Sequence, residues 1–233
     1  FKVILAHIFR KIFTKADHVQ AISNYLADWA RSMGAKAPIE VVPNGVDLSK
    51  IKNTLPQRQS AAMAGAETQN TKIIITTSRL VYKNGIDVLI RAIANVQHRI
   101  SNIKLQILGS GPDEKKLKDL AEELKVDDII QFLGHIEPEK VYDYLAEADI
   151  FVRPSRSEGL GSSFLEAMGA GLPIVGTPVG GIPDFLKDGE TGLFCRVDDP
   201  QDLAEKIKKL MADEALAKRI AENGRQLVLE KYD

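Results

Sequence analysis

The sequence predicts an α/β fold, with an open, twisted parallel sheet and helices on both of its faces. Segments rich in Val and Ile recur along the chain, and each is followed by a stretch with helical apolar spacing, as in successive parallel βαβ units. Most of these segments are continuous apolar runs, which is typical of strands covered on both faces. At 233 residues the chain is long enough for one full domain and part of another. The expected architecture is therefore Rossmann-like.

Each expected element follows from one of these two patterns. The Val- and Ile-rich runs place strands near residues 39–42, 73–77, 104–108, 129–133, 150–153, 174–177 and 193–196. The helical spacing places helices near residues 23–33, 86–97, 113–124, 138–146, 162–169, 200–211 and 214–230.

A polar, Ala-rich and aperiodic segment at residues 54–71 precedes the first strong strand. We interpret it as a loop at the start of a domain. Upstream, residues 17–43 offer a strand, a helix and a strand, which is too little to close a core. We therefore expect residues 1–46 to be the end of one domain and residues 47–233 to form the next. The chain begins with Phe1 rather than Met, so we expect a piece of a longer protein.

The first sixteen residues have the pattern of a basic amphipathic helix. They combine Lys2, Arg10, Lys11 and Lys15 with Phe1, Ile4, Leu5, Ile8, Phe9 and Ile12. Such a helix can lie on an anionic membrane surface, or it can pack on the rest of its own domain. We favour packing and keep peripheral membrane contact as the alternative.

Composition argues against several classes of protein. The 31 Lys and Arg residues against 32 Asp and Glu give a formal net charge of −1, which supplies no long-range field for nucleic acid. The single Cys195 cannot form an internal disulfide and lacks partners at metal-ligand spacing, so a reducing, intracellular setting is preferred. No apolar run reaches the roughly 18 residues that a membrane span needs. We expect a cytoplasmic location, or the cytoplasmic face of a membrane if the amphipathic helix binds there.

The most informative chemical pattern is RPSRSEGLGSSFLEAMGA at residues 153–170. A buried strand, a Gly-rich turn and a helix in this order present free backbone N–H groups and the positive end of a helix dipole to an anion. Gly159 and Gly161 lack a Cβ, so a phosphate can approach the main chain. Ser162 and Ser163 are candidates for capping the helix and for donating their hydroxyls. Ligands of open α/β sheets bind at the carboxyl ends of strands, where this turn must lie.

Two glutamates bracket the turn, with seven residues between them. Glu166 lies within the helix, and a carboxylate about one turn from a bound pyrophosphate can accept hydrogen bonds from both ribose hydroxyls. Glu158 precedes the first glycine and would face whatever is attached beyond the phosphates. Taken singly, each glutamate could equally be a solvated charge. The whole pattern favours a binding site.

These residues carry a resemblance to a known family. The order E-G-L-G-S-S-F-L-E, followed by Ala167, Met168, Gly171 and Pro173, resembles the Glu-x7-Glu motif of the retaining GT-B glycosyltransferases of family four, also called glycosyl transferases group one. Further pieces follow in family order: P-N-G-V-D at residues 43–47, S-R-L at 78–80, G-S-G-P at 109–112, F-L-G at 132–134 and G-G-I-P-D at 180–184. The resemblance covers nearly the whole chain. It implies that residues 47–233 are the nucleotide-sugar donor-binding domain of a GT-B enzyme, and that residues 1–46 are the C-terminal end of its acceptor-side domain.

The resemblance also implies roles for single residues. Arg79 and Lys83 resemble the basic pair that neutralises the donor diphosphate, although the family's lysine commonly stands at the position of Asn84. Glu166 would hold the ribose, and Glu158 would hold the transferred sugar. The other donor-binding residues implied are Gly159, Leu160, Gly161, Ser162 and Ser163 at the phosphates, His135 and Ile136 at the nucleobase, and Gly109.

Several common ligand motifs are missing from the sequence. It contains no Asp-x-Asp pair, no Gly-x4-Gly-Lys phosphate loop and no complete G-x-G-x-x-G fingerprint after the first strand. The charge of the leaving group must then be met by Arg79, Lys83 and backbone donors, so we expect no metal and no cofactor. We assign no proton chemistry to His135. Gly180 and Gly181 either form a tight βα turn or border the sugar pocket.

The expected function is transfer of a sugar from a UDP- or GDP-linked donor to an acceptor hydroxyl, and the family resemblance implies retention of configuration. The acceptor is open: a sugar, a lipid-linked sugar or a small molecule. The alternative is a nucleotide-sugar binding module without turnover. A nucleotide-sugar epimerase of the same architecture is disfavoured, because the Glu-x7-Glu spacing is specific to the transferases.

Overall fold

The computed structural model describes residues 2–50, 71–97, 100 and 102–233. Apart from Thr71, the expected loop at residues 54–71 lies outside the described residues. The strands are β1 (Val19–Ala21), β2 (Ile39–Val41), β3 (Lys72–Thr77), β4 (Ile103–Leu108), β5 (Ile130–Gly134), β6 (Ile150–Arg153), β7 (Ile174–Gly176) and β8 (Leu193–Phe194). The α-helices are α1 (Lys2–Lys15), α2 (Asn24–Ser32), α4 (Ile86–Gln97), α5 (Glu114–Glu123), α6 (Pro138–Glu147), α7 (Ser162–Gly169), α8 (Pro200–Ala212) and α9 (Glu214–Lys231). Short 3₁₀ helices are η1 (Leu48–Lys50), η2 (Tyr82–Asn84), η3 (Asp127–Ile129) and η4 (Ile182–Asp184).

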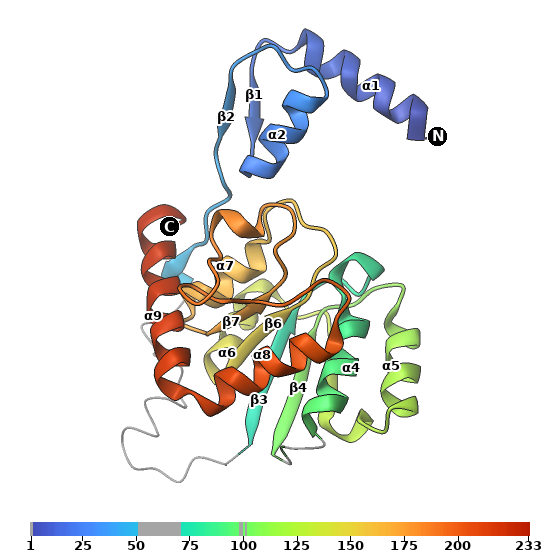
Figure 1. Ribbon diagram of the computed structural model, residues 1–233, viewed down its shortest axis with the longest axis vertical. Coiled ribbons are helices and arrows are strands. Elements are labelled where there is room, and N and C mark those ends of the chain that lie inside the picture. Colours follow the sequence, from blue (N-terminus) through green and yellow to red (C-terminus); the bar gives the residue numbers. More distant parts are fainter. Residues whose placement is uncertain (1, 51–70, 98–99, 101) are drawn as a thin grey trace.

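The main sheet has six parallel strands in the order β5-β4-β3-β6-β7-β8 (Figure 1). This confirms the predicted fold class. From β3 the chain first builds outward through β4 and β5, then returns to add β6, β7 and β8 on the other side of β3. The direction of building therefore reverses between β3 and β6, and open α/β sheets bind ligands beside such a reversal.

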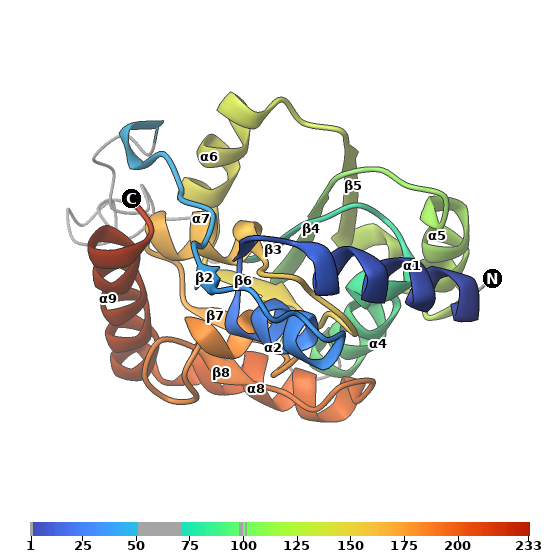
Figure 2. The ribbon, with the colours of Figure 1, turned by 90° about the horizontal axis from the view of Figure 1, so that it is seen from above.

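Each central strand sends alternate side chains to opposite faces, and both faces are buried. Ile74 and Ile75 are each 0% exposed but belong to two separate apolar clusters. The first cluster joins the sheet to α4, α5, α8 and the start of α9; the second joins it to α6, α7 and the end of α9. Seen from above, α4 and α8 lie on one side of the sheet and α6 on the other (Figure 2). Burial on both faces is the reason that the strands read as continuous apolar runs.

The predicted elements are present, with small shifts at their ends. The strand expected from residue 129 begins at Ile130, because Asp127–Ile129 form the 3₁₀ helix η3. The strand expected at 193–196 ends at Phe194, although the Cys195 amide still donates to the Gly176 carbonyl at 2.8 Å. The helices expected from residues 86, 138, 162, 200 and 214 begin at those residues.

The N-terminal residues form a small unit beyond the end of the sheet at which α7 begins (Figure 1). The short strands β1 and β2 pair in parallel, and α2 packs beside them. Several contacts between described residues join this unit to the loops of the main sheet. The Asn24 amide donates to Asp184 Oδ2 at 2.8 Å, and a Cβ on Gly181 would lie 2.6 Å from the Cβ of Ser23. The unit therefore lies over the edge where ligands of such sheets bind.

Helix α1 packs on α2 through aromatic rings. Phe9 and Phe13 contact the Trp29 ring edge-on, with centroid distances of 5.3 and 5.4 Å. Ile8 and Ile12 are exposed, at 47% and 55%. Within the described ranges, no helix combines the length and apolar character needed to cross a bilayer.

Candidate functional site

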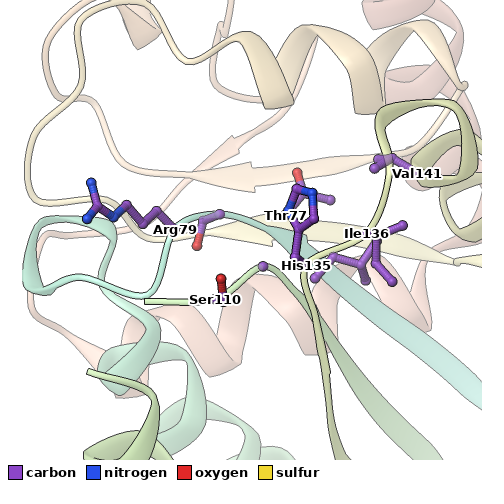
Figure 3. A pocket seen from close by; sticks show the side chains of 9 residues that line it. Thr77, Arg79, Ser110, His135, Ile136 and Val141 are labelled. Carbon is purple, nitrogen blue, oxygen red and sulfur yellow. The ribbon is translucent and has the colours of Figure 1, made fainter. Parts of the chain in front are cut away.

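A cavity of about 370 Å³ opens where β3, β4 and β5 end (Figure 3). The segments after these three strands contribute its lining, together with one residue of α6. Four of the residues singled out from the sequence line this cavity: Arg79, Gly109, His135 and Ile136. They are up to 57 positions apart along the chain. The other lining residues are Thr77, Ser78, Leu108, Ser110 and Val141.

Gly109 allows the ends of β3 and β4 to meet. Its φ is +128°, and a Cβ there would lie 1.9 Å from the carbonyl oxygen of Ser78. Its amide donates to the Gly134 carbonyl at 2.7 Å, which ties in the end of β5. No residue with a side chain could occupy this position without separating the strands.

Two hydroxyls inside the cavity were missed by the sequence reasoning. Thr77 Oγ1 and Ser78 Oγ are buried and have no hydrogen-bond partner among the described residues. Buried polar groups in proteins almost always have a hydrogen-bond partner. Two hydroxyls without one, both in residues that line a cavity, are well suited to hydrogen-bond a ligand. Both residues stand where β3 ends, a position that the strand prediction alone could have marked.

The cavity has two chemically different ends. Arg79 extends at one end, and His135, Ile136 and Val141 gather at the other (Figure 3). The Arg79 side chain is exposed, as is His135, which stays within 3.8 Å of the Glu137 carboxylate. A cation at one end and an apolar wall at the other suit a ligand that has an anionic part and a flat ring.

The turn before α7 presents free amides. Gly161 occupies the N-cap position with φ +95° and ψ +55°, a left-handed conformation that favours glycine. Phe164 is the first residue whose amide bonds back, to the Gly161 carbonyl at 2.9 Å. Within the described structure, the amides of residues 159–163 have no acceptor in the chain. The turn thus has the donor array that the sequence predicted.

The prediction that Ser162 or Ser163 caps this helix is wrong. Gly161 takes the cap position, and no side chain bonds the first turn of the helix. Because Gly161 adopts a left-handed conformation, both serines fall inside the helix instead of before it. The Ser163 hydroxyl accepts a hydrogen bond from Arg153 Nη1.

Glu158 is engaged within the protein. Its Oε1 lies 2.6 Å from Arg153 Nη2 and accepts a hydrogen bond from Ser155 Oγ at 3.0 Å. The residue is 8% exposed, and so is Arg153. The sequence reasoning expected Glu158 to face a ligand and did not single out Arg153. In the structure the Glu158 carboxylate forms a buried ion pair with Arg153 next to the turn, through Oε1.

The segment after β3 is fixed against the segment after β6. Asn84, which is 1% exposed, donates to the Arg79 carbonyl at 2.6 Å and accepts from Arg153 Nη2 at 3.1 Å. The Arg156 amide donates to the Lys83 carbonyl at 2.7 Å. Arg79 and Lys83 are therefore carried on a turn that is bonded to the Glu158 loop, across the point where the sheet reverses. The Lys83 side chain is exposed.

Glu166 lies half-buried on α7. Burial raises the pKa of its carboxyl, and the charge of Arg153 partly offsets that effect. The Tyr142 pKa is raised to about 12 by burial and by the charges of Glu166 and Asp47, which places the α6 hydroxyl in the field of this carboxylate. In the described ranges, no three His, Cys, Asp or Glu side chains are grouped in a way that could hold a metal ion.

The Gly180–Gly181 pair packs against the Glu158 loop. A Cβ on Gly180, where φ is +57°, would lie 1.8 Å from the Glu158 carbonyl oxygen. A Cβ on Gly181 would lie 2.3 Å from the Gly159 carbonyl oxygen. The pair is therefore more than a tight turn after β7, because it allows two loops and the N-terminal unit to approach each other beside the α7 turn.

The sequence matches two family profiles. The family described as glycosyl transferases group 1 matches residues 58–227, and glycosyltransferase family 4 matches residues 1–50.

Similar proteins are known among curated sequences. The chain is 30% identical over 231 residues to a GDP-mannose-dependent alpha-(1-6)-phosphatidylinositol monomannoside mannosyltransferase of Mycolicibacterium smegmatis, covering 96% of this chain and 60% of that protein. It is 34% identical over 213 residues to a GDP-mannose-dependent monoacylated alpha-(1-6)-phosphatidylinositol monomannoside mannosyltransferase of Corynebacterium glutamicum, covering 88% and 55%. The chain thus spans somewhat more than half the length of these relatives.

Solved structures have the same fold. Sucrose-phosphate synthase of Thermosynechococcus elongatus superposes with a TM-score of 0.87 at 26% identity, over 99% of this chain and 58% of that one. Alr3699/HepE of Anabaena, in complex with UDP and glucose, also gives 0.87 at 21% identity, over 100% of this chain and 64% of that one.

Proposed function

Because the chain belongs to the glycosyl transferases group 1 family, we propose that it binds a UDP- or GDP-linked sugar and takes part in moving that sugar to an acceptor hydroxyl. It spans 55–60% of the length of the two curated relatives, so the activity of the whole protein is part of this proposal. Those relatives are GDP-mannose-dependent by name, and the Anabaena structure contains UDP and glucose. The proposal therefore includes both uracil and guanine as the base of the donor. The acceptor in the proposal is a sugar, a lipid-linked sugar or a small molecule.

The observation that carries the proposal is the free amide array of residues 159–163 at the start of α7. These donors stand at the reversal point of the sheet, bonded through Arg153 and Asn84 to the turn that carries Arg79. Backbone N–H groups, the helix dipole and a guanidinium together favour a doubly charged diphosphate. The backbone amides need no reorganisation when the charge on the leaving group develops, because the turn and the helix already hold them in place.

We propose that the nucleoside of the donor binds in the cavity at the ends of β3, β4 and β5. With the diphosphate near Arg79, the base would lie at the end made by His135, Ile136 and Val141, with Gly109 beneath it. Glu166 would accept hydrogen bonds from the ribose hydroxyls. Glu158 would stand toward the transferred sugar, with one carboxylate oxygen already held by Arg153. Lys83 would add positive charge at the diphosphate from its exposed position.

The proposed reaction retains configuration by a front-face route. The bond between the anomeric carbon and the phosphate oxygen breaks, and its electron pair leaves with the nucleoside diphosphate. The acceptor oxygen bonds to the same face of the anomeric carbon, and its proton passes to the departing phosphate oxygen. This route needs no enzymic nucleophile, no metal and no cofactor, because Arg79, Lys83 and the amides offset the charge of the leaving group. The proposed location is the cytoplasm.

Two measurements test the proposal. Calorimetry of the chain should detect binding of UDP or GDP with an affinity well above that of uridine or guanosine. Incubation of the donor sugar with and without candidate acceptors should release nucleoside diphosphate together with an acceptor-linked product of unchanged anomeric configuration. Binding without any product would leave the alternative, a nucleotide-sugar binding module. Failure to bind either nucleoside diphosphate would refute both.

A further inference from the structure

Arg153 stands at the last position of β6 and is bonded to residues of four segments of the candidate site. It is 8% exposed. Its Nη2 contacts Glu158 Oε1 at 2.6 Å and Asn84 Oδ1 at 3.1 Å. Its Nη1 contacts the Ser163 hydroxyl, and the Thr77 carbonyl at 3.4 Å. One guanidinium therefore joins the end of β3, the turn after it, the Glu158 loop and the first turn of α7.

The stability of the fold does not account for this arrangement. Burial lowers the pKa of Arg153, since the low-dielectric surroundings disfavour its charge. Its Nε is also buried without a partner among the described residues. A buried ion pair is commonly no more stabilising than a neutral pair of similar shape, and an unpaired buried N–H adds a penalty. A function of the site is the remaining reason for a charge here.

The charges around the turn suggest that function. Both Glu158 and Glu166 act on Arg153 electrostatically, so two carboxylates lie near the amides of residues 159–163. Without the guanidinium, a diphosphate arriving at these amides would meet two negative charges and no buried positive one. With it, the Glu158 charge is neutralised at 2.6 Å, and the amide array stays favourable for an anion.

The bond to Ser163 adds a directional effect. A serine hydroxyl has one donor hydrogen and two acceptor lone pairs. Because Ser163 Oγ accepts from a positively charged group, its own hydrogen points elsewhere and is polarised for donation. The hydroxyl at the second position of α7 is thereby set to donate to an anion.

We infer that Arg153 is a positioning residue of the donor site, which neutralises Glu158, orients the Ser163 hydroxyl and fixes the Arg79 turn so that the start of α7 accepts a diphosphate. The inference rests on the proposed function, because it assumes that the diphosphate binds at this turn. It adds to that function a residue that need not touch the ligand itself.

The test is calorimetry with UDP, GDP, uridine and guanosine on the wild-type chain and three variants. Arg153→Met should lose roughly tenfold or more in affinity for the diphosphate that the wild type binds, with little change for the matching nucleoside. Arg153→Lys, which keeps the charge, should lose less. The double variant Arg153→Met with Glu158→Gln removes the buried carboxylate along with its partner and should recover most of the diphosphate affinity. It also keeps the test valid if Arg153→Met alone unfolds, because it leaves no buried charge unpaired.

Arg156→Met is the matched control. Arg156 lies three positions on and pairs with Asp87 and Asp198 at 2.7 and 2.6 Å. The Arg156 side chain contacts neither Glu158 nor Ser163 in the described structure, but its Nη1 donates to the Tyr82 carbonyl of η2 at 2.6 Å. Its loss should therefore lower thermal stability and weaken diphosphate binding much less than Arg153→Met does.

Four results would overturn the inference. Equal losses for nucleoside and diphosphate in Arg153→Met would show a general structural role. A double variant that binds diphosphate no better than Arg153→Met, or unchanged binding in all variants, would remove the charge argument while leaving the proposed function intact. If the wild type binds neither UDP nor GDP, the proposed function fails and this inference fails with it.

Discussion

The two sides of the candidate site are built differently. On the α7 side, Arg153 and Glu158 are buried and paired, and Gly180 brings a second loop into backbone contact with the first. On the cavity side, Arg79 and His135 are exposed, and lining hydroxyls have no partner in the described structure. The first side is preorganised, whereas the second leaves polar groups free for a ligand.

In the proposed function, the two sides would recognise different parts of the donor. A diphosphate is the same in every such nucleotide sugar, so a rigid set of charges and amides can be fixed for it in advance. The base differs between UDP- and GDP-linked donors, and an open cavity with unpaired hydroxyls would accommodate that variation. Four predictions test the comparison between the two sides.

The largest effect is expected from adding a side chain at Gly180, where two loops are in backbone contact on the α7 side. Gly180→Ala places a Cβ 1.8 Å from the Glu158 carbonyl oxygen at a φ of +57°. The left-handed conformation and the clash together should lower the free energy of unfolding by about 3 kcal/mol and abolish nucleotide binding. Chemical denaturation and calorimetry measure both.

Gly134→Ala is the control on the cavity side. Its φ of +68° is similar, but nothing lies within 4 Å of the added Cβ. Only the conformational cost of about 1 kcal/mol is expected. Equal destabilisation by the two substitutions would contradict the close packing of the α7 side.

The second prediction concerns the exposed cations Arg79 and Lys83, on the segment between β3 and α4. Arg79→Ala should weaken UDP or GDP binding by roughly 10- to 100-fold, because it removes a charge-assisted hydrogen bond, and leave nucleoside binding unchanged. Lys83→Ala should have a smaller effect of the same kind. Calorimetry at two salt concentrations checks the charge effect, since the Arg79 contribution at this exposed position should shrink as salt rises. Equal losses for nucleoside and nucleotide would refute the phosphate role.

The sequence predicted the sheet well because burial on both faces leaves a direct pattern. The runs that became β3 and β6 contain continuous apolar stretches at residues 73–75 and 150–152, which are typical of strands covered on both faces. Likewise, the turn at Gly159 and Gly161 could be recognised from the sequence, because glycines between a strand and a helix indicate a tight turn before the helix N-terminus.

What the sequence missed depends on contacts between distant residues. Arg153 ends a buried strand, and nothing local indicates that its partners are Asn84 and Ser163, 69 and 10 positions away. The capping prediction for Ser162 failed because Gly161, in a left-handed conformation, takes the N-cap position itself. Gly109 was singled out only from the family resemblance. The structure explains why a glycine is needed there: a Cβ would clash with the carbonyl oxygen of Ser78, 31 positions earlier.

The third prediction concerns Glu166, which lies half-buried on α7. Glu166→Gln should weaken nucleotide binding about tenfold, because a neutral amide accepts more weakly from the ribose hydroxyls than a carboxylate does. A 2′,3′-dideoxynucleoside diphosphate offers no hydroxyls there, so it should bind the variant and the wild type equally. A tenfold loss that persists with this ligand would contradict the ribose assignment.

The same variant has an opposite effect on stability. Because burial raises the Glu166 pKa in the folded chain, its charged form is disfavoured by folding. Without ligand, Glu166→Gln should therefore be more stable than the wild type at neutral pH. The difference should disappear as the pH falls through the raised pKa toward the value of an unfolded glutamate, where both side chains are neutral. Denaturation at several pH values measures it.

The smallest effect is expected at His135. Its side chain is 72% exposed and stands at the apolar end of the cavity. His135→Ala should weaken nucleoside and nucleotide binding by the same factor, roughly two- to fivefold, because it removes contact area with the base and no contact with phosphate. Competitive calorimetry with uridine and guanosine resolves so small a change. A loss confined to the diphosphate would instead place the phosphates at this end of the cavity, and would reverse the orientation that the α7 amides and Arg79 favour.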